Sequence, residues 1–216
     1  MLLAFDTATP HVTVALHDGE DVVVELRADR PMKHAEQLAP LIEQALSAAG
    51  IVRQDLTAIA AGVGPGPFTG LRVGLVTART LAFVLDVPVY GVCTLDVLAV
   101  EAADGATVQG GTDQGFVVAT DARRKEVYLA RYDAAGARLD GPVVGRPADL
   151  ATDDRVVGEG GVLYPDAFPH RAGPTAPSAG WLARAVAEER AEIVDPEPLY
   201  LRRPDAMAPH APKRVS

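Results

Sequence analysis

Two aspartates are the first residues of this chain whose type and position could support chemistry. Asp6 and Asp121 each follow a short apolar run that is typical of a strand. In two facing lobes such carboxylates could hold a metal–phosphate pair or act as a base. Each could also simply cap a turn. We favour this role because the segment Asp6-Thr7-Ala8-Thr9 lacks the glycine that lets a backbone approach a phosphate.

A glycine-rich loop at residues 62–70 is the second candidate, with the sequence Gly-Val-Gly-Pro-Gly-Pro-Phe-Thr-Gly. Such a loop before a helix can bind phosphate, because the unpaired N–H groups of a helix N-terminus attract anions. It lacks the Gly-Lys-[Ser/Thr] of a P-loop, and Pro65 and Pro67 each remove a backbone donor. We therefore interpret it as a structural turn with Thr69 as the helix cap. A nucleotide contact is the alternative, and its residues would be Asp6, Gly64, Gly66 and Thr69.

Other catalytic constellations are missing from the sequence. The five histidines are scattered without helical pairing and without a nearby cysteine, so no metal site is predicted. None of the three serines lies in a Gly-x-Ser-x-Gly motif, which argues against a serine hydrolase. We predict no catalytic residue, no metal and no cofactor.

The charge of the chain restricts its partners. With 216 residues, 48% of them hydrophobic, the protein is long and apolar enough to fold, and its net charge is -9. An acidic chain is a poor match for a nucleic-acid backbone, so a basic surface would come from another subunit. Small basic clusters leave a direct nucleic-acid contact as a minor alternative. They consist of Arg123, Arg124 and Lys125 and of Arg202 and Arg203.

We expect a cytoplasmic protein without a membrane span. The N-terminus has no basic region or cleavage site of a signal peptide, and the single cysteine, Cys93, suits a reducing compartment. The longest apolar run, residues 68–85, contains Arg72 and Arg79. Two arginines would be costly in lipid, so the run predicts a packed helix.

The pattern of the chain predicts two similar halves. In the first half, strands are expected at residues 2–5, 12–16, 22–26, 58–63 and 87–92, and helices at 34–49, 69–85 and 94–103. After a linker at 105–115, strands are expected at 116–120, 126–132, near 143 and at 155–157, and helices at 146–151 and 178–192. Both halves follow the order βββαβα. This predicts a duplicated α/β fold with an N-terminal lobe at 1–104 and a C-terminal lobe with a surface tail at 105–216, facing each other across a cleft.

Small side chains recur every four residues along the second helix, at Gly70, Gly74, Ala78 and Ala82. Such a stripe lets another helix approach closely. It fits packing inside the lobe and an interface with another chain equally well. If it is an interface, the residues expected to form it are Leu38, Leu41, Ile42, Leu71, Gly74, Leu75, Ala78 and Ala82.

Residues 64–74, Gly-Pro-Gly-Pro-Phe-Thr-Gly-Leu-Arg-Val-Gly, resemble the signature Gly-Pro-Gly-Ser-Phe-Thr-Gly-Leu-Arg-[Ile/Val]-Gly of the TsaB (YeaZ) family. Residues 3–8, 34–42, 121–128 and 200–202 are similar to other segments of that family. Two positions depart from the pattern, because Pro67 replaces the usual Ser and Arg79-Thr80 stands where Lys-Gly is common.

The resemblance implies an actin-like, RNase H-like pair of lobes and a non-catalytic role. The family serves bacterial tRNA threonylcarbamoyladenosine biosynthesis, in which threonylcarbamoyl is transferred to N6 of adenosine 37 in tRNAs that read ANN codons. A TsaB-like chain is implied to dimerise with a catalytic TsaD-type paralogue through its N-terminal helices. A small TsaE-type ATPase joins the complex, and the chain is implied to meet tRNA only indirectly, through that complex. The paired metal-binding histidines of the catalytic paralogue have no counterpart in residues 94–103.

Other assignments stay open at this point. Alone, the same helical face could form a homodimer. One rival is a small ATPase or sugar kinase of the same fold that uses Asp6 and the loop at 62–70. Another is a peptidase, for which the sequence offers no nucleophile or metal pair.

Overall fold

The computed structural model describes residues 1–29, 31, 33–104 and 115–202. A six-stranded sheet with the order β10-β5-β4-β1-β2-β3 forms the centre of the first lobe. Its strands are β1 (Leu2–Asp6), β2 (Thr13–His17), β3 (Val22–Arg27), β4 (Ala58–Gly62), β5 (Val89–Val92) and β10 (Ile193–Val194). β1, β4 and β5 are parallel, and β2, β3 and β10 run antiparallel to their neighbours.

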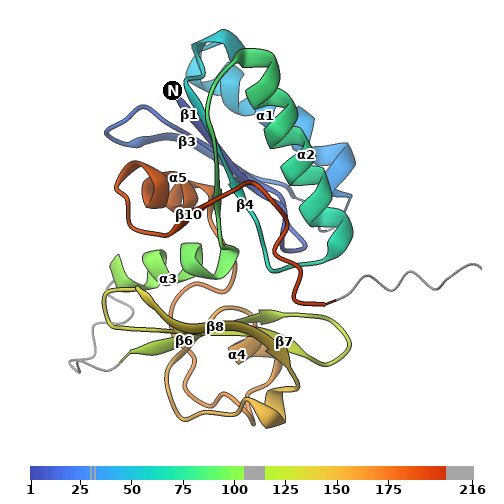
Figure 1. The fold of residues 1–216 in the computed structure, drawn as a ribbon, viewed down its shortest axis with the longest axis vertical. Helices are drawn as coiled ribbons and strands as arrows, with labels where there is room; N and C mark the ends of the chain where they lie inside the picture. The colour runs from blue at the N-terminus through green and yellow to red at the C-terminus, as the bar shows by residue number, and fades with distance from the viewer. Residues whose placement is uncertain (30, 32, 105–114, 203–216) are drawn as a thin grey trace, which may run out of the picture.

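Helices cover both faces of this sheet. α1 (His34–Ala49) and α2 (Phe68–Leu85) lie on one face, and α5 (Ala179–Ala187) lies on the other (Figure 1). The side chains of β1 show how both faces are covered, because successive side chains of a strand point to opposite faces of the sheet. Leu3 and Phe5 belong to the cluster beneath α1 and α2, whereas Ala4 packs with α5. α5 can approach closely because the residue beneath it is small.

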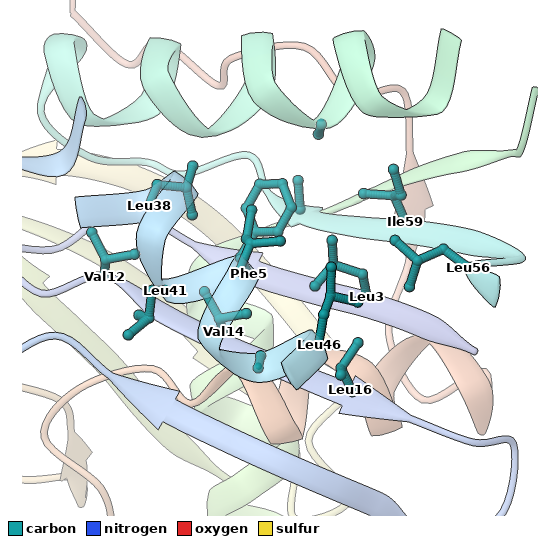
Figure 2. Close-up of a cluster of buried hydrophobic side chains, with 14 of the residues drawn as sticks. Leu3, Phe5, Val12, Val14, Leu16, Leu38, Leu41, Leu46, Leu56 and Ile59 are labelled. Carbon is teal, nitrogen blue, oxygen red and sulfur yellow. The ribbon is translucent and has the colours of Figure 1, made fainter. Parts of the chain in front are cut away.

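The larger apolar core lies between the sheet and α1. Figure 2 shows side chains of β1 and β2 packed against Leu38, Leu41 and Leu46 of α1. The most buried of these side chains, Leu3, Phe5 and Leu38 among them, have at most 1% of their surface exposed. Fully burying one such side chain contributes roughly 1.5–3 kcal/mol. This core fixes the position of α1 and, through it, the position of α2.

The second lobe contains a four-stranded sheet with the order β8-β7-β6-β9. Its strands are β6 (Phe116–Asp121), β7 (Val127–Tyr132), β8 (Arg138–Gly145) and β9 (Val156–Val157), followed by the short α4 (Gly160–Leu163). α3 (Thr94–Asp104) lies between this sheet and the first lobe (Figure 1). Leu95 and Leu98 of α3 pack with Phe116 of the second sheet, whereas Val97 packs with Leu182 of α5. α3 therefore joins the two lobes.

The predicted duplicated, actin-like α/β fold is confirmed. Each half opens with three consecutive antiparallel strands, followed by a strand parallel to the first. The division at residue 104 stays a prediction. β6 to β9 follow it, but α5 and β10 return to the first sheet, so part of 105–216 packs within the N-terminal lobe.

Several predicted element boundaries were wrong. The expected helix at 146–151 is a single 3-10 turn, Pro147–Asp149, and the expected helix at 178–192 ends at Ala187. A second 3-10 turn, Arg53–Asp55, precedes β4. α1 continues through Pro40 as one helix. The expected linker at 105–115 lies, apart from its last residue, outside the described residues.

Candidate functional site

The small-residue stripe of α2 faces the protein's own interior. A Cβ atom added at Gly74 would lie 2.3 Å from Thr7 Oγ1, and one added at Gly70 would lie 2.4 Å from the carbonyl oxygen of Thr7. The Thr7 hydroxyl donates a hydrogen bond of 2.9 Å to the Gly70 carbonyl. The glycines therefore let α2 pack directly on the segment that follows β1.

The residues expected to form the interface stay a prediction, and in this structure they are buried. Every one of the eight lies inside the lobe, at 8% exposure or less for those with a side chain beyond glycine. They are Leu38, Leu41, Ile42, Leu71, Gly74, Leu75, Ala78 and Ala82. Their surface is largely used by packing within the lobe.

The opposite face of α2 is apolar and exposed. Val76, Phe83 and Val84 are 63%, 88% and 69% exposed, and a spacing of seven and eight residues puts them on one side of the helix. α2 is apolar and long enough to cross a membrane by length and composition, with 33% of the helix buried. Its inner face packs on β4 and α1, as the sequence predicted for a packed helix. The outer three side chains form what we call the α2 outer patch.

A C-terminal segment, residues 195–202, borders this patch, and we call it the C-terminal strap. The ring of Tyr200 stacks on Phe68 at 4.9 Å between centroids. Arg72 donates from Nε to the Tyr200 hydroxyl at 3.1 Å, and its guanidinium lies 3.7 Å from the Phe68 centroid. Arg79 pairs with Glu197 at 3.3 Å. The two arginines of α2 and the strap thus form a polar border along the patch.

Asp6 is a buried structural residue in this fold. It is 1% exposed, its Oδ1 accepts a hydrogen bond of 2.6 Å from the Ala8 N–H, and its Oδ2 accepts one of 2.6 Å from the Thr94 hydroxyl. Burial raises the pKa of Asp6 above its ordinary value, and the two hydrogen bonds partly oppose this. Both oxygens are thereby engaged within the chain.

The other residues of the nucleotide alternative do not converge with Asp6 on a site. Gly64 and Gly66 are buried, and a Cβ at Gly66 would lie 2.3 Å from the Ala8 carbonyl oxygen. Thr69 was expected to cap α2. It lies inside the first turn instead, and the N-cap is Pro67, which has no side-chain hydrogen bond. His34, the first residue of α1, is buried with its Nε2 2.7 Å from the Thr9 carbonyl oxygen.

A cavity of about 530 Å³ lies in the cleft between the lobes. Its polar lining comes from both lobes and includes Thr9, His11, Arg27, Asp121, Arg123 and Glu159. The lining contains none of the four residues of the nucleotide alternative. Asp121 accepts a hydrogen bond of 2.8 Å from the Arg123 N–H and pairs with the Arg123 guanidinium at 3.3 Å, which is the turn role favoured from the sequence.

The turn between β6 and β7 has an unusual backbone. Arg123, Arg124 and Lys125 have φ angles of 60°, 56° and 60°, so three consecutive residues with side chains are left-handed. This conformation costs roughly 1–2 kcal/mol for each such residue. Sequence reasoning could not find the turn, because left-handed positions are normally indicated by Gly or Asn.

Comparisons with known proteins identify chains that resemble this one in sequence and fold. A family model described as TsaD, tRNA N6-adenosine threonylcarbamoyltransferase, matches residues 29–157. YeaZ from Pseudomonas aeruginosa is 32% identical with a TM-score of 0.73, over 93% of this chain and 99% of that one. A second solved structure, an uncharacterized P. aeruginosa protein with similarity to peptidase YEAZ, is 31% identical with a TM-score of 0.75 and the same coverage.

Relatives by sequence give the same result. An uncharacterized protein of Mycobacterium tuberculosis is 43% identical over 95% of this chain and 93% of its own length. The tRNA threonylcarbamoyladenosine biosynthesis protein TsaB of Escherichia coli is 37% identical over 61% of this chain and 54% of its own length. On the shared fold, the signature loop and these matches, the chain belongs to the TsaB/YeaZ family.

Proposed function

We propose that this chain takes part in tRNA threonylcarbamoyladenosine biosynthesis as a non-catalytic subunit. In this role it binds a TsaD-type catalytic partner and activates it, a TsaE-type ATPase joins the assembly, and the complex acts in the cytoplasm. The transferred group is threonylcarbamoyl, and the acceptor is N6 of adenosine 37 in tRNAs that read ANN codons. Family membership supports the pathway, and the α2 outer patch supports the binding role.

The exposed apolar face of α2 is the observation that carries the proposal. Phe83 is 88% exposed, although a large aromatic side chain at that exposure gains nothing from the fold of its own chain. Val76 and Val84 extend the apolar surface along the same face, and Arg72 and Arg79 with the strap border it. An apolar centre with a polar rim is the usual anatomy of a protein interface.

Burial of the patch would contribute useful binding energy. Fully burying three side chains of this size contributes roughly 5–9 kcal/mol, at 1.5–3 kcal/mol for each, before the costs of association. The proposed partner surface is a helix with an apolar stripe, because the side-chain ridges of one helix pack into the grooves of another. The interface proposed here thus keeps α2 of the sequence-based hypothesis but uses the opposite face of that helix.

Replacement of Phe83 by glutamate tests the proposal. In Phe83→Glu an unpaired charge would enter the apolar centre of the complex, so we expect at least a hundredfold loss of affinity for the TsaD-type partner by titration calorimetry. Leu139→Glu is the matched control, because Leu139 is 68% exposed on β8 of the other lobe. Thermal unfolding of both variants should match that of the unchanged chain.

Reconstitution then separates the possible outcomes. With the partner, the ATPase and an unmodified tRNA transcript, modification should require this chain and should fail with Phe83→Glu. Full affinity of Phe83→Glu for the partner would reject α2 as the interface. Loss of self-association without loss of partner binding would assign the patch to a homodimer. Modification of tRNA by this chain alone would reject the non-catalytic role.

A further inference from the structure

The left-handed turn of Arg123, Arg124 and Lys125 is basic, exposed and firmly held. All three side chains are exposed. The Glu126 N–H donates to the Arg123 carbonyl at 3.0 Å, which closes the turn. Arg202 of the C-terminal strap donates to the Ala122 carbonyl at 2.8 Å and pairs with Glu126. Contacts from both ends of the turn therefore hold a backbone that the residues themselves disfavour.

The choice of residues at the turn is informative. Among the described residues a positive φ occurs at seven glycines, from Gly19 to Gly173, which adopt this conformation without strain. Outside the turn it also occurs at Lys33, Asp86 and Glu189, but each of these is a single residue, whereas the turn has three in succession. Three arginine or lysine side chains gain nothing from a left-handed backbone. Strain of this kind persists where the surroundings impose it, and it concentrates at functional sites. A strained turn of this kind is therefore a candidate site for binding a ligand through its side chains.

The charges around the turn indicate the kind of ligand. Asp121 pairs with Arg123, and Glu126 pairs with Arg202. Arg27 of the other lobe and Glu159 line the same cavity as Arg123. The turn itself carries no apolar side chain, and the nearest apolar residues along the chain, Ala122 and Val127, are buried. A protein interface would need an apolar centre. A phosphate backbone requires only closely spaced cations.

We propose that Arg123, Arg124 and Lys125 bind the phosphate backbone of RNA. The inference rests on the proposed function, in which the RNA is the tRNA substrate of the assembled complex. It changes the sequence-based expectation that another subunit supplies the whole basic surface, because this acidic chain contributes a local basic contact of its own. The contact is independent of base sequence, since each cation reads charge and not base edges.

Salt-dependent binding tests the inference. The probe is an unmodified transcript of an ANN-decoding tRNA, and the protein is the full complex with its TsaD-type partner and TsaE-type ATPase. Arg124→Gln and Lys125→Gln should each raise Kd roughly fivefold, and the double variant more than tenfold. The slope of log K against log salt should become shallower by about 1 for each phosphate contact removed.

Arg53→Gln is the matched control, because Arg53 is an exposed arginine in the 3-10 turn before β4, at the opposite end of the first sheet from the cleft. It should leave Kd within twofold. Arg124→Gly provides an independent test, because glycine relieves the left-handed backbone while it removes the charge. We expect this variant to unfold at a higher temperature and to bind RNA more weakly.

The outcomes distinguish this inference from the proposed function. If tRNA modification requires the chain but the turn variants bind RNA like the unchanged complex, the inference is wrong and the function stands. If the variants lose the partner protein in size-exclusion chromatography and keep RNA affinity, the turn is a protein contact and the inference is again wrong. If modification proceeds without the chain, the proposed function is wrong whatever the turn binds.

Discussion

Asp6 illustrates how one carboxylate can suggest chemistry and yet serve the fold. Its two oxygens hold the Ala8 backbone and the Thr94 side chain, so it joins the end of β1 to the start of α3. Gly62 permits this arrangement, because a Cβ there would lie in the position of the Asp6 carboxylate. The kinase-like alternative needs an Asp6 that faces a ligand, whereas both carboxylate oxygens of Asp6 accept hydrogen bonds within the chain.

Substitutions of Asp6 separate the two roles. We expect Asp6→Asn to change the free energy of unfolding by about 1 kcal/mol or less, because the amide retains the bond to Ala8 and can donate to Thr94. Asp6→Ala should cost about 2–3 kcal/mol, since both partners lose their acceptor. Urea unfolding measures both changes. An Asp6→Asn variant that folded normally but abolished tRNA modification by the complex would show a chemical role.

Glu101 on α3 gives the stability of the protein a pH dependence. Burial, and secondarily the negative charge of Glu25, raises the pKa of Glu101 from 4.5 to about 7. Its Oε2 is buried and has no hydrogen-bond partner among the described residues. Because the folded protein holds this proton more tightly than the unfolded chain, the stabilisation is complete below pH 4.5. It is lost as the pH rises through about 7.

Glu101→Gln should remove this dependence. The side chain is partly exposed, so screening by water reduces the effect to on the order of 1 kcal/mol. We expect the variant to be more stable than the unchanged chain at pH 8 and to show a smaller decline in unfolding free energy between pH 5 and pH 8. Glu43→Gln, at an exposed position of α1, is the control. An unchanged pH profile of Glu101→Gln would contradict the assignment.

The helix α2 has two faces, one packed inside the protein and one exposed. The inner face packs on the sheet and on the Thr7 segment through glycine and alanine. The outer face carries Val76, Phe83 and Val84. A helix this apolar on both sides is expected where both faces are covered, and the fold of this chain covers one.

Gly74→Leu tests the inner face. The new side chain would collide with Thr7, so we expect a loss of about 3 kcal/mol or more in unfolding free energy, as for an overpacked core. Thr80→Leu, at an exposed position of the same helix, should be neutral within about 0.5 kcal/mol. Denaturant unfolding measures both. Equal stability of the two variants would mean that the inner face tolerates bulk and that α2 is held less closely than described.

The whole molecule depends on α3, which packs on both lobes. Asp96 of this helix is 4% exposed and accepts a hydrogen bond of 2.7 Å from the Tyr132 hydroxyl on β7. Arg138 on β8 lies 3.6 Å from the same carboxylate and also pairs with Glu192 near the first lobe. Buried polar groups of this kind specify one arrangement, because each is costly without its partners.

Asp96→Ala should therefore destabilise the protein as a whole. We expect a loss of about 3 kcal/mol, because the Tyr132 hydroxyl becomes unpaired in the interior and Arg138 loses one partner. Asp104→Ala is the control on the same helix, since its pair with Arg190 is exposed and worth at most about 1 kcal/mol. Urea unfolding followed by tryptophan fluorescence measures both. A loss below 1 kcal/mol for Asp96→Ala would show that this network does not hold the lobes together.

Local patterns predicted most of the elements. The strands β1 and β2 depend on neighbours along the chain, and the structure has both within one residue of the expected bounds. The same holds for α2, whose predicted start differs by one residue. The predicted boundaries were wrong where only a few residues determine the local structure, as in the 3-10 turn at Pro147 and the early end of α5 at Ala187.

By itself the sequence determined the family, the α/β class and the helix that the function is proposed to use, because motifs and periodicity are properties of neighbours along the chain. Tertiary structure alone decided which side of α2 is buried, since an apolar helix offers two faces and only the approach of Thr7 selects one. It also decided that Asp6 lies inside and that Arg123, Arg124 and Lys125 form a left-handed turn. Burial and strain are set by contacts between residues far apart in sequence, such as Arg202 with Ala122.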